Sequence, residues 1–412
     1  MLTNLGINAK NASRVLMCAS SEQKNEALKQ IALELINNSE YIIKENKKDL
    51  DTARENGMSE SMLDRLSLSE QRIKDIADAV KKIVDYDDPV GRVISGTKRP
   101  NGLLIEKVSV PLGVVAVIFE ARPNVTVDAA ALCLKSGNSV ILRGGKEAIN
   151  SNMAMAETMR KAISKSGLPE DCIQLVSDTS RDSANALMKM NDYVDVLIPR
   201  GGAGLIKACV ENSTVPVIET GTGNCHIYID KDADINKAVS IVYNAKTSRP
   251  SVCNACESLV IHEGIAKQVL PLIKEKLDEK NVVIHGDEIT SSIIPDVIAA
   301  TYEDYAKEYL GYEISVKIVS DMGGAIDHIM KYTSGHSECI ITENYTASKI
   351  FTSSIDAAAV YVNASTRFTD GGEFGFGAEI GISTQKLHAR GPLGLSELTS
   401  FKYIISGDGQ VR

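Results

Sequence analysis

A cysteine in the connection between a helix and a strand is the residue of this sequence best placed to do chemistry. Cys253 follows Pro250, after a helical run at 234–247 and before an apolar run at 258–261 that has the composition of a strand. Because proline ends helices, the thiol is predicted to lie in a loop that a small molecule can reach. A thiolate is a strong nucleophile near neutral pH once its surroundings lower its pKa. The loop position alone leaves a second interpretation open, a buried and inert thiol.

Cys256 completes a Cys-x-x-Cys pair with Cys253, a spacing that occurs in redox dithiols and in metal sites. The sequence has no second such pair and no histidine pair at metal spacing, so we predict no metal site. A redox-sensing or scaffold protein with this dithiol is the non-enzymatic alternative. We interpret Cys256 as incidental to catalysis. The cysteines follow no repeating spacing, which is typical of reduced thiols: Cys18, Cys133, Cys172, Cys209, Cys225, Cys253, Cys256 and Cys339.

Composition and charge narrow the class of protein. The 412 residues are 43% hydrophobic, enough for two or three domains with their own cores. A formal net charge of −9 argues against nucleic acid or an anionic membrane as the main partner. No run approaches the roughly 20 apolar residues that cross a bilayer, and the first residues lack the pattern of a signal peptide. We therefore predict a cytoplasmic protein that acts on a small molecule.

Strand-like and helical runs alternate over most of the chain. Residues 1–90 have the pattern of helices, and within 113–212 four apolar runs each precede a helical stretch. A second alternating series runs from 225 to 362, after the Gly-rich stretch 219–224. Regular alternation of this kind indicates parallel doubly wound sheets. We predict an α/β protein whose two domains meet at 219–224.

Residues 92–110 have a different character. Two short extended runs flank Asn101 and Gly102, and Asn-Gly between extended runs indicates a hairpin turn. The run at 398–405 has the pattern of a strand that can pair with the open edge of this hairpin, within one chain or across a subunit boundary. The sequence therefore predicts a β arm, and a homo-oligomer is an expectation that goes with it.

These stretches together resemble one known family. Residues 248–257, which include Cys253, closely resemble the active-site segment of the γ-glutamyl phosphate reductases, a family of the aldehyde dehydrogenase superfamily. The resemblance extends over nearly the whole chain. Four further stretches carry it: 115–128, 224–228, 334–338 and 374–392.

The resemblance implies an aldehyde dehydrogenase-like α/β fold, with two doubly wound parallel α/β domains and a small β oligomerisation arm. It implies a division of the chain into four parts. These are an NADP-binding domain (1–95 and 112–224), a catalytic domain with Cys253 (225–362), a Gly-rich segment that lines the cleft (363–395) and the oligomerisation arm (96–111 and 396–412).

The resemblance also implies a reaction in proline biosynthesis. Cys253 would attack the acyl carbon of L-glutamyl 5-phosphate and release phosphate, and NADPH would reduce the thioester to L-glutamate 5-semialdehyde. Asn124 would donate its side-chain amide to the oxyanion. A CoA-acylating or hydrolytic aldehyde dehydrogenase is the alternative, and dependence on phosphate separates the two. The chain begins with the helices of the reductase, so we expect a separate glutamate kinase to make the acyl phosphate, and a transient contact with that kinase is a hypothesis.

Two Gly-rich turns are the candidates for holding the cofactor. The sequence has no G-x-G-x-x-G, and the family resemblance points instead to Arg143, Gly144, Gly145 and Lys146, whose cations favour the 2′-phosphate of NADPH. Another turn could present backbone N–H groups to the pyrophosphate; it contains Arg200, Gly201 and Gly202.

One acidic residue and four possible substrate contacts complete the set of candidates. Glu219 stands where hydrolytic relatives keep a general base, which a reductase does not need, so we place it beside the cofactor. The α-carboxylate of the substrate calls for a cation, and arginine grips carboxylates with two hydrogen bonds. The candidates for substrate binding are Arg122, Arg249, His336 and Arg367, with a packed histidine as the alternative for His336.

Overall fold

A computed structural model describes residues 2–120 and 122–412, and Met1 and Ala121 lie outside this description. The chain forms two compact units. The first unit consists of Met1–Thr220, Gly375–Gly381 and Leu393–Arg412, and the second of Gly221–Phe374 and Ile382–Pro392. The first crossing between the units therefore falls inside the Gly-rich stretch 219–224.

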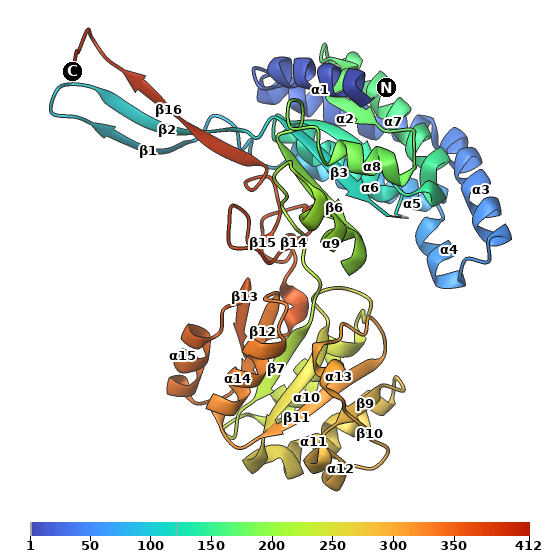
Figure 1. Cartoon of the computed structure of the whole chain (residues 1–412), viewed down its shortest axis with the longest axis vertical. Helices are drawn as coiled ribbons and strands as arrows, with labels where there is room; N and C mark the ends of the chain where they lie inside the picture. Colours follow the sequence, from blue (N-terminus) through green and yellow to red (C-terminus); the bar gives the residue numbers. More distant parts are fainter. Residues whose placement is uncertain (1, 121) are drawn as a thin grey trace. The chain divides into compact units, whose positions relative to one another are not determined.

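Helices form the beginning of the first unit, as the sequence predicts. Apolar side chains on one face of each long helix are buried, which is the usual source of helix stability in a folded protein. The helices are α1 (Leu2–Leu16), α2 (Ser21–Asn37), α3 (Ser39–Glu55), α4 (Glu60–Leu66) and α5 (Glu70–Val84) (Figure 1).

A four-stranded parallel sheet in the order β5-β4-β3-β6 is the centre of the first unit. Every residue of its inner strand β3 (Val114–Phe119) is buried, which explains the unbroken apolar run in the sequence. The other strands are β4 (Ser139–Arg143), β5 (Ile173–Leu175) and β6 (Val196–Arg200), and the connecting helices are α6 (Asn124–Lys135), η1 (Lys146–Ala148), α7 (Ile149–Ser164), η2 (Glu170–Cys172), α8 (Arg181–Leu187) and α9 (Ala203–Asn212).

The second unit contains a seven-stranded parallel sheet in the order β10-β9-β11-β8-β7-β12-β13. Its strands are β7 (Cys225–Ile229), β8 (Cys256–His262), β9 (Val283–Gly286), β10 (Ile298–Ala299), β11 (Glu313–Val319), β12 (Ser337–Ile341) and β13 (Ala359–Val362). The predicted alternation and parallel pairing are confirmed in both units.

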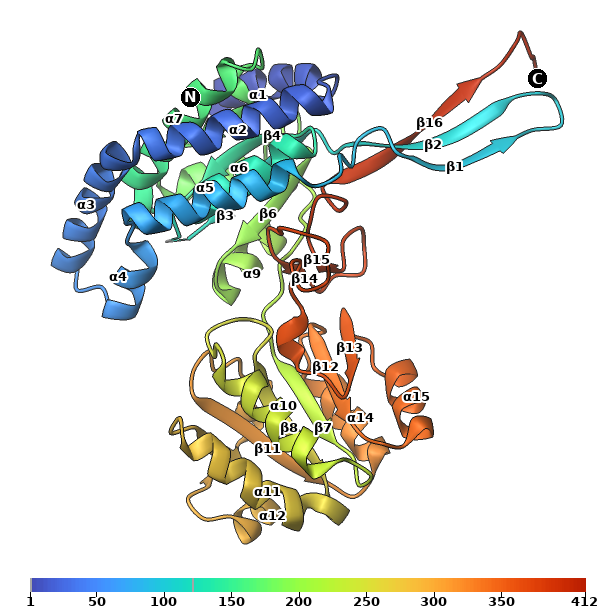
Figure 2. The same ribbon diagram turned by 180° about the vertical axis from the view of Figure 1, so that it is seen from behind.

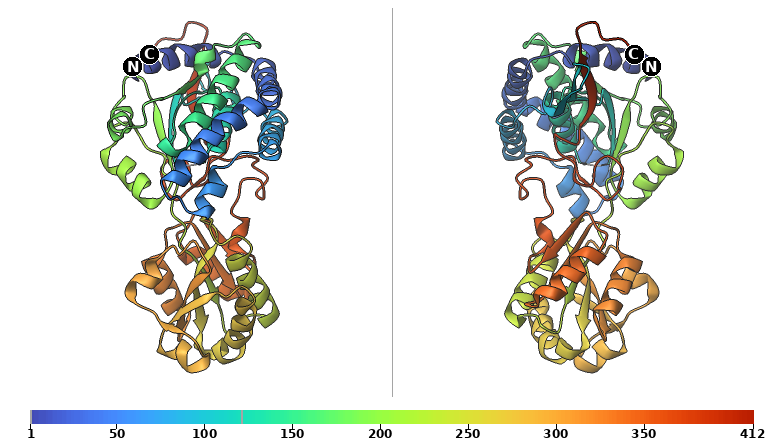
Figure 3. Two further views of the ribbon diagram at one scale, coloured as in Figure 1. Left: turned by 90° about the vertical axis from the view of Figure 1, so that its right-hand side faces the viewer. Right: turned by 90° about the vertical axis from the view of Figure 1, so that its left-hand side faces the viewer.

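Helices cover both faces of this second sheet (Figure 3). On one face Ile227 and Leu259 pack in a core cluster with residues of α10 and α11, and on the other face Tyr228 and Val260 pack with residues of α14 and α15. The helices are α10 (Ile235–Thr247), α11 (Glu263–Asp278), α12 (Glu288–Ile293), α13 (Tyr302–Ala306), α14 (Met322–Tyr332) and α15 (Tyr345–Ser354).

The predicted hairpin and its third strand form an arm on the first unit. β1 (Val93–Lys98) and β2 (Leu104–Pro111) are antiparallel, and the turn contains Gly102 at φ +93°, a conformation that glycine adopts without strain. β16 (Thr399–Ser406) pairs with the other edge of β2 within the same chain. The three strands form an extended ribbon whose β1 residues are all exposed (Figure 2).

Residues 363–395 contain little regular structure. They include the short helix η3 (Thr366–Phe368) and the antiparallel pair β14 (Ile382–Ser383) and β15 (Gly391–Pro392). This segment contributes to both units, which the sequence did not indicate. Among the helices of the described residues, none has both the length and the apolar character to cross a bilayer.

Candidate active site

Cys253 lies in a short turn between α10 and β8, in the second unit. The predicted loop position is confirmed, because α10 ends at Thr247 and Pro250 stands in the turn that follows. The cysteine is partly exposed, whereas Ala255 and Cys256, two and three residues further along, are fully buried, and Cys256 begins β8. The buried strand thus anchors one end of the turn and leaves the thiol-bearing residue within reach of solvent.

The backbone of Cys253 rests against the residues that lead into β7. A Cβ atom on Gly223 would lie 1.6 Å from the Cys253 carbonyl oxygen, so only glycine fits at position 223. The Cys225 thiol donates to the same carbonyl at 3.2 Å. These two contacts on one carbonyl fix the backbone from which the Cys253 side chain projects.

Asn254 joins the Cys253 turn to the segment around η3. Its amide nitrogen donates to the Thr369 carbonyl at 2.9 Å, its side-chain oxygen accepts from Arg367, and the Thr366 hydroxyl donates to its backbone carbonyl at 2.8 Å. Arg367 also donates from Nε to the Ser248 hydroxyl at 3.1 Å. The guanidinium of Arg367 is therefore held against the turn from two sides.

Two guanidinium groups share the electrostatic environment of the Cys253 thiol. Burial lowers the pKa of Arg367, the neighbouring Arg249 lowers it further, and the Cys253 thiolate acts in the opposite direction. Arg249 is exposed and Arg367 is half-buried. Arginine stays charged at any physiological pH, so two cations lie near the Cys253 thiol, together with the carboxylates of Asp370 and Glu373.

The neighbouring cysteines have a different environment. Cys225 and Cys256 are fully buried, and burial is the largest cause that raises the pKa of each thiol above its ordinary value. Cys256 donates to the Ser258 carbonyl at 3.4 Å. Buried thiols with raised pKa values are poor nucleophiles, which distinguishes both residues from the partly exposed Cys253.

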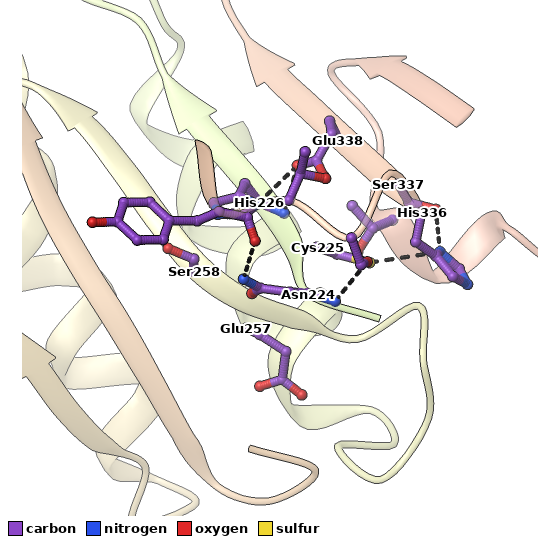
Figure 4. A network of polar contacts seen from close by, with 12 residues as sticks. Asn224, Cys225, His226, Glu257, Ser258, His336, Ser337 and Glu338 are labelled. Atoms are coloured by element: carbon purple, nitrogen blue, oxygen red, sulfur yellow. Dashed lines mark hydrogen bonds and ion pairs between the residues drawn. The ribbon is translucent and has the colours of Figure 1, made fainter. Parts of the chain in front are cut away.

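His336 is packed inside the second unit. Its ring is fully buried, its Nδ1 atom lies 2.8 Å from the Ser337 hydroxyl and 3.7 Å from the Cys225 sulfur, and burial lowers its pKa to about 4. The Ser337 hydroxyl continues a chain of hydrogen bonds to Thr369 at 2.6 Å and from there to Tyr361 at 2.7 Å. His336 is therefore neutral near pH 7, and Figure 4 shows it beside Cys225.

A second histidine forms a buried hydrogen-bonded pair with a glutamate at the same end of the sheet (Figure 4). His226 Nδ1 lies 3.1 Å from a Glu338 carboxylate oxygen, and the His226 backbone N–H donates to the same oxygen at 2.8 Å. The other carboxylate oxygen accepts from the Thr333 hydroxyl. Both side chains of the pair are fully buried. Their hydrogen bonds explain how two polar side chains are accommodated inside β7 and β12.

Asn124 lies in the first unit, as the first residue of α6. Its side-chain nitrogen donates to the Asp128 carboxylate at 2.9 Å, one helical turn further along. Burial raises the pKa of Asp128 to about 6, against the opposing effects of this hydrogen bond and of Arg200. Asp128 was not among the residues singled out from the sequence, although its i, i+4 spacing from Asn124 is visible there.

The first of the two candidate cofactor turns follows β4. Arg143 donates to the carbonyls of Thr179 at 2.6 Å and Ser180 at 2.9 Å, while its buried Nε atom has no hydrogen-bond partner. Gly144 packs so closely that a Cβ atom would lie 2.1 Å from the Asn152 side chain. Lys146 is exposed at the start of η1, directly after Gly145. The turn thus presents the exposed ammonium of Lys146 beside the guanidinium of Arg143, part of which is already hydrogen-bonded to backbone carbonyls.

The second candidate turn joins β6 to α9. Gly202 is the N-cap of α9, and its N–H donates to the Glu120 carboxylate at 3.0 Å. A Cβ atom on Gly201 would lie 2.6 Å from the same carboxyl group. Arg200 ends β6. In this structure a carboxylate of the protein therefore occupies the anion-binding position at the start of the helix.

Glu219 and Arg122 also belong to the first unit. Glu219 is half-buried in the connection between α9 and β7, beside Thr220, whose hydroxyl donates to the Pro199 carbonyl at 2.7 Å. Arg122 is exposed directly before α6. Among the predicted site residues, the structure brings together Cys253, Arg249 and Arg367 in the second unit. In the first unit it pairs the predicted Asn124 with Asp128, which was not predicted.

The comparison with protein families and relatives gives a consistent result. A model described as the aldehyde dehydrogenase family matches residues 8–293. The γ-glutamyl phosphate reductase of Clostridium botulinum is 60% identical over 407 residues, which cover 99% of this chain and 98% of the relative. The γ-glutamyl phosphate reductase of Clostridium perfringens is 61% identical over 407 residues, with the same coverage.

Solved structures extend this similarity to three dimensions. The crystal structure of γ-glutamyl phosphate reductase from Thermotoga maritima has a TM-score of 0.98 and 48% identity, over 100% of this chain and 99% of that chain. An acetylating aldehyde dehydrogenase from Geobacillus thermoglucosidasius has a TM-score of 0.71 at 19% identity, over 100% of this chain and 97% of that chain. The second likeness concerns the fold alone.

Proposed function

The chain belongs to the aldehyde dehydrogenase family and, within it, to the γ-glutamyl phosphate reductases, and from this premise we propose that Cys253 is the nucleophile. The chain is therefore an oxidoreductase of proline biosynthesis, and the predicted family, fold and activity are confirmed. The roles of individual residues are our proposal. It is supported above all by the position of Cys253 in a turn whose backbone is fixed by Gly223 and Cys225.

The first step uses the cysteine and the cations beside it. The Cys253 thiolate attacks the acyl carbon of L-glutamyl 5-phosphate, the bond from that carbon to the phosphate oxygen breaks, and phosphate leaves from a thioester. Arg367, which Asn254 and Ser248 hold against the turn, stabilises the thiolate before the attack and the negative charge of the leaving phosphate during it. When bound, the nicotinamide cofactor supplies the hydride that converts the thioester to the aldehyde level. The bond between this carbon and the Cys253 sulfur then breaks, which releases L-glutamate 5-semialdehyde and returns the thiolate.

Asn124 serves the oxyanion in this proposal. A primary amide has two N–H groups, and the bond to Asp128 orients the amide through one of them. Because the bond to Asp128 fixes the orientation of the amide, it also fixes the direction of the other N–H. An oxyanion donor has to have a fixed direction before the reaction begins.

Cofactor binding is proposed for the first unit. The residues at the carboxyl ends of β4 and β6 fit a dinucleotide, because Lys146 is an exposed cation and the buried Arg143 Nε still lacks a partner. Lys146 and Arg143 would hold the 2′-phosphate, which favours NADPH over NADH. Gly201 and Gly202 would hold the pyrophosphate after the Glu120 carboxylate turns away. Glu219 is proposed to lie beside the cofactor.

The amino-acid end of the substrate is assigned to arginine. Arg249 is exposed next to the Cys253 turn and is our first candidate for the α-carboxylate, with Arg367 and the exposed Arg122 as the others. His336 is buried and hydrogen-bonded to Ser337, which supports a structural role for it in place of the predicted contact with substrate.

The arm supports the proposal of a homo-oligomer. Apolar and aromatic side chains stand exposed on the ribbon, among them Ile94 at 56%, Tyr403 at 59% and Ile405 at 60%. Exposed apolar side chains on a three-stranded ribbon indicate a site of contact with another protein surface. We propose that a second copy of this chain provides that surface. Ile405→Asp is expected to lower the molecular mass seen in sedimentation equilibrium to that of one chain, and an unchanged mass would contradict this role.

A reducing compartment suits a catalytic thiol, so we propose a cytoplasmic location. Glutamate kinase is the enzyme that we propose as the source of the acyl phosphate. The contact with glutamate kinase remains a hypothesis. Identical flux from freely diffusing and cross-linked partners would argue against channelling between the two enzymes.

The experiment that tests the reaction is run in the reverse direction. Glutamate semialdehyde and NADP are mixed with the purified protein, and cofactor reduction is followed with and without phosphate or arsenate. We expect turnover only when one of these anions is present. Equal rates in their absence would overturn the proposal in favour of a hydrolytic enzyme, and a requirement for CoA would indicate an acylating one.

A further inference from the structure

A segment that follows α13 forms hydrogen bonds with residues that contact or follow the Cys253 turn. Residues 308–310, which follow α13, lie in the second unit with that turn. Glu308 accepts a hydrogen bond from the Gly223 N–H at 2.7 Å, and the Leu310 N–H donates to Glu257 at 3.2 Å. Gly223 precedes β7 and Glu257 lies in β8, so the segment connects both strands that flank the nucleophile.

The contact through Gly223 leads directly to the nucleophile. The close approach of Gly223 to the Cys253 carbonyl oxygen leaves no room for a side chain, so a shift of the Gly223 backbone has to displace Cys253 as well. Within the second unit, Glu308 is the side chain that holds the Gly223 N–H. Its carboxyl group is half-buried, and burial raises its pKa while the bond to Gly223 lowers it.

The contact through Glu257 fixes the other end of the turn. Lys246 and Glu257 form an ion pair of 2.5 Å between fully buried side chains, one at the end of α10 and one at the start of β8. The Leu310 N–H satisfies the second carboxylate oxygen of Glu257. Leu310 donates this bond from a left-handed conformation, with φ at +56°, which is unusual in a residue other than glycine.

We propose that Glu308 is a positioning residue for the reaction, because its carboxylate holds the Gly223 N–H and Gly223 in turn fixes the Cys253 backbone. The inference rests on the proposed role of Cys253 as the nucleophile. A small displacement of a reacting group lowers the rate strongly, by roughly 10²-fold for 1 Å. Glu308 does not have to touch the substrate to have such an effect.

Three substitutions separate the hydrogen bond from the charge. Glu308→Gln keeps an oxygen that can accept from the Gly223 N–H, whereas Glu308→Ala removes it and Glu308→Asp keeps the charge on a side chain one methylene shorter. Asp321→Ala is the matched control, since the Asp321 carboxylate likewise accepts from a backbone N–H, that of Gly324 at 2.8 Å, at the start of α14.

Two measurements are made on each variant after its melting temperature has been recorded. The first is kcat and KM in the phosphate-dependent assay. The second is the rate of alkylation of Cys253 by iodoacetamide, read by peptide mass spectrometry and divided by the rate of the exposed Cys18 in the same molecule. This ratio reports the reactivity of the thiol without any substrate or cofactor, and it excludes differences in reagent or protein concentration.

We expect Glu308→Ala and Glu308→Asp to lower kcat at least about tenfold with KM within about twofold, and to change the alkylation ratio by about fivefold or more. Glu308→Gln should change each value by at most about threefold, and Asp321→Ala should change neither. Unchanged values in folded Glu308→Ala or Glu308→Asp would overturn the inference, and so would a Gln variant as slow as the Ala variant. Full turnover of Cys253→Ser would instead overturn the proposed nucleophile.

Discussion

The residues proposed to be functional lie at opposite ends of the strands in the two sheets of this protein. In the first unit Arg143 and Arg200 end β4 and β6, which is the carboxyl end where ligands of open α/β sheets usually bind. In the second unit Cys253 precedes β8, at the amino end of its sheet. Under the proposed roles, the same parallel architecture therefore has its dinucleotide site at the carboxyl end of one sheet and its covalent chemistry at the amino end of the other.

The amino ends of the second sheet also contain buried charge. His226, Glu257 and Glu338 are fully buried near the starts of β7, β8 and β12, and the strand register places His226 beside Glu338. The inner strand β3 of the first sheet consists entirely of apolar residues. Fixed polar groups limit the movement of the strands that lead to the proposed nucleophile, whereas the apolar strand β3 lies beside the turns proposed to bind the cofactor.

The largest expected effect tests whether the amino end of the second sheet is the catalytic one. Cys253→Ser should lower kcat by at least about 10³-fold, since removal of a nucleophile leaves only binding and electrostatic contributions. Cys256→Ser, three residues further into the sheet, should keep most of the activity. Both are measured by phosphate-dependent reduction of NADP. If Cys253→Ser retains more than about one tenth of the normal kcat, Cys253 is not the nucleophile.

The next effect concerns stability and sharpens the contrast between a charged and an apolar strand. Glu338→Leu should lower the free energy of unfolding by about 3–5 kcal/mol, because it leaves the buried His226 and Thr333 groups without their partner. Ile118→Val in β3 should cost about 0.5–1.5 kcal/mol. Urea unfolding followed by circular dichroism gives both free energies. Equal losses of stability in the two variants would contradict the difference we expect between the buried polar pair and the apolar strand.

A smaller effect is expected from the cations beside the thiol. Arg367→Gln should slow alkylation of Cys253 by iodoacetamide about tenfold at pH 7, because the thiolate loses a neighbouring charge. Lys274→Gln, which removes a cation from the α11 pair with Asp278, is the control and should leave that rate unchanged. If Arg367→Gln reacts as fast as the unmodified protein, the guanidinium does not activate the thiol.

The smallest effect belongs to the carboxyl end of the first sheet and depends on pH. The pKa of Asp128 is about 6, so its carboxyl group is ionised at pH 7.5 and largely protonated at pH 5. Protonation weakens the bond that orients Asn124, and kcat should fall roughly fivefold as the pH decreases through 6. Asp128→Asn should have a lower kcat that no longer changes in this range.

The stability effect of the same group has the opposite sign. The folded-state pKa of Asp128 is raised above its ordinary value, so protonation favours the folded state, and the contribution of this group to stability is lost as the pH rises through about 6. Acid should therefore slow the enzyme without unfolding it through Asp128. A melting temperature that falls together with kcat between pH 7 and pH 5.5, and does so less in Asp128→Asn, would contradict this assignment.

The sequence predicted what depends on local pattern. The turn at Gly102, the strand at 114–119 and the loop position of Cys253 follow from the properties of glycine, apolar runs and proline, and the structure confirms all three. The pairing of β16 with β2 was predicted as one of two arrangements, and it occurs within the chain.

Features that depend on distant partners were missed. Strand β12 and helices α14 and α15 were not predicted, and Ser337 and Glu338 at the start of β12 do not have the appearance of a buried strand. Their burial becomes understandable only from His226 and Thr333, which satisfy the carboxylate. The support that Glu308 gives to Gly223 joins residues 85 positions apart, and no spacing rule indicates such a contact.

The pairing of β16 with β2 has a consequence for the synthesis of the chain. β2 ends at Pro111 and β16 begins at Thr399, so 399 − 111 gives 288 positions between them. At roughly 5–20 residues per second, a ribosome takes about 15–60 s to cover that distance. During this time the hairpin of β1 and β2 has emerged with an edge of β2 unpaired, and such an edge can pair with another nascent chain. The arm is thus a place where neighbouring ribosomes on one messenger can bring two copies together before either is complete.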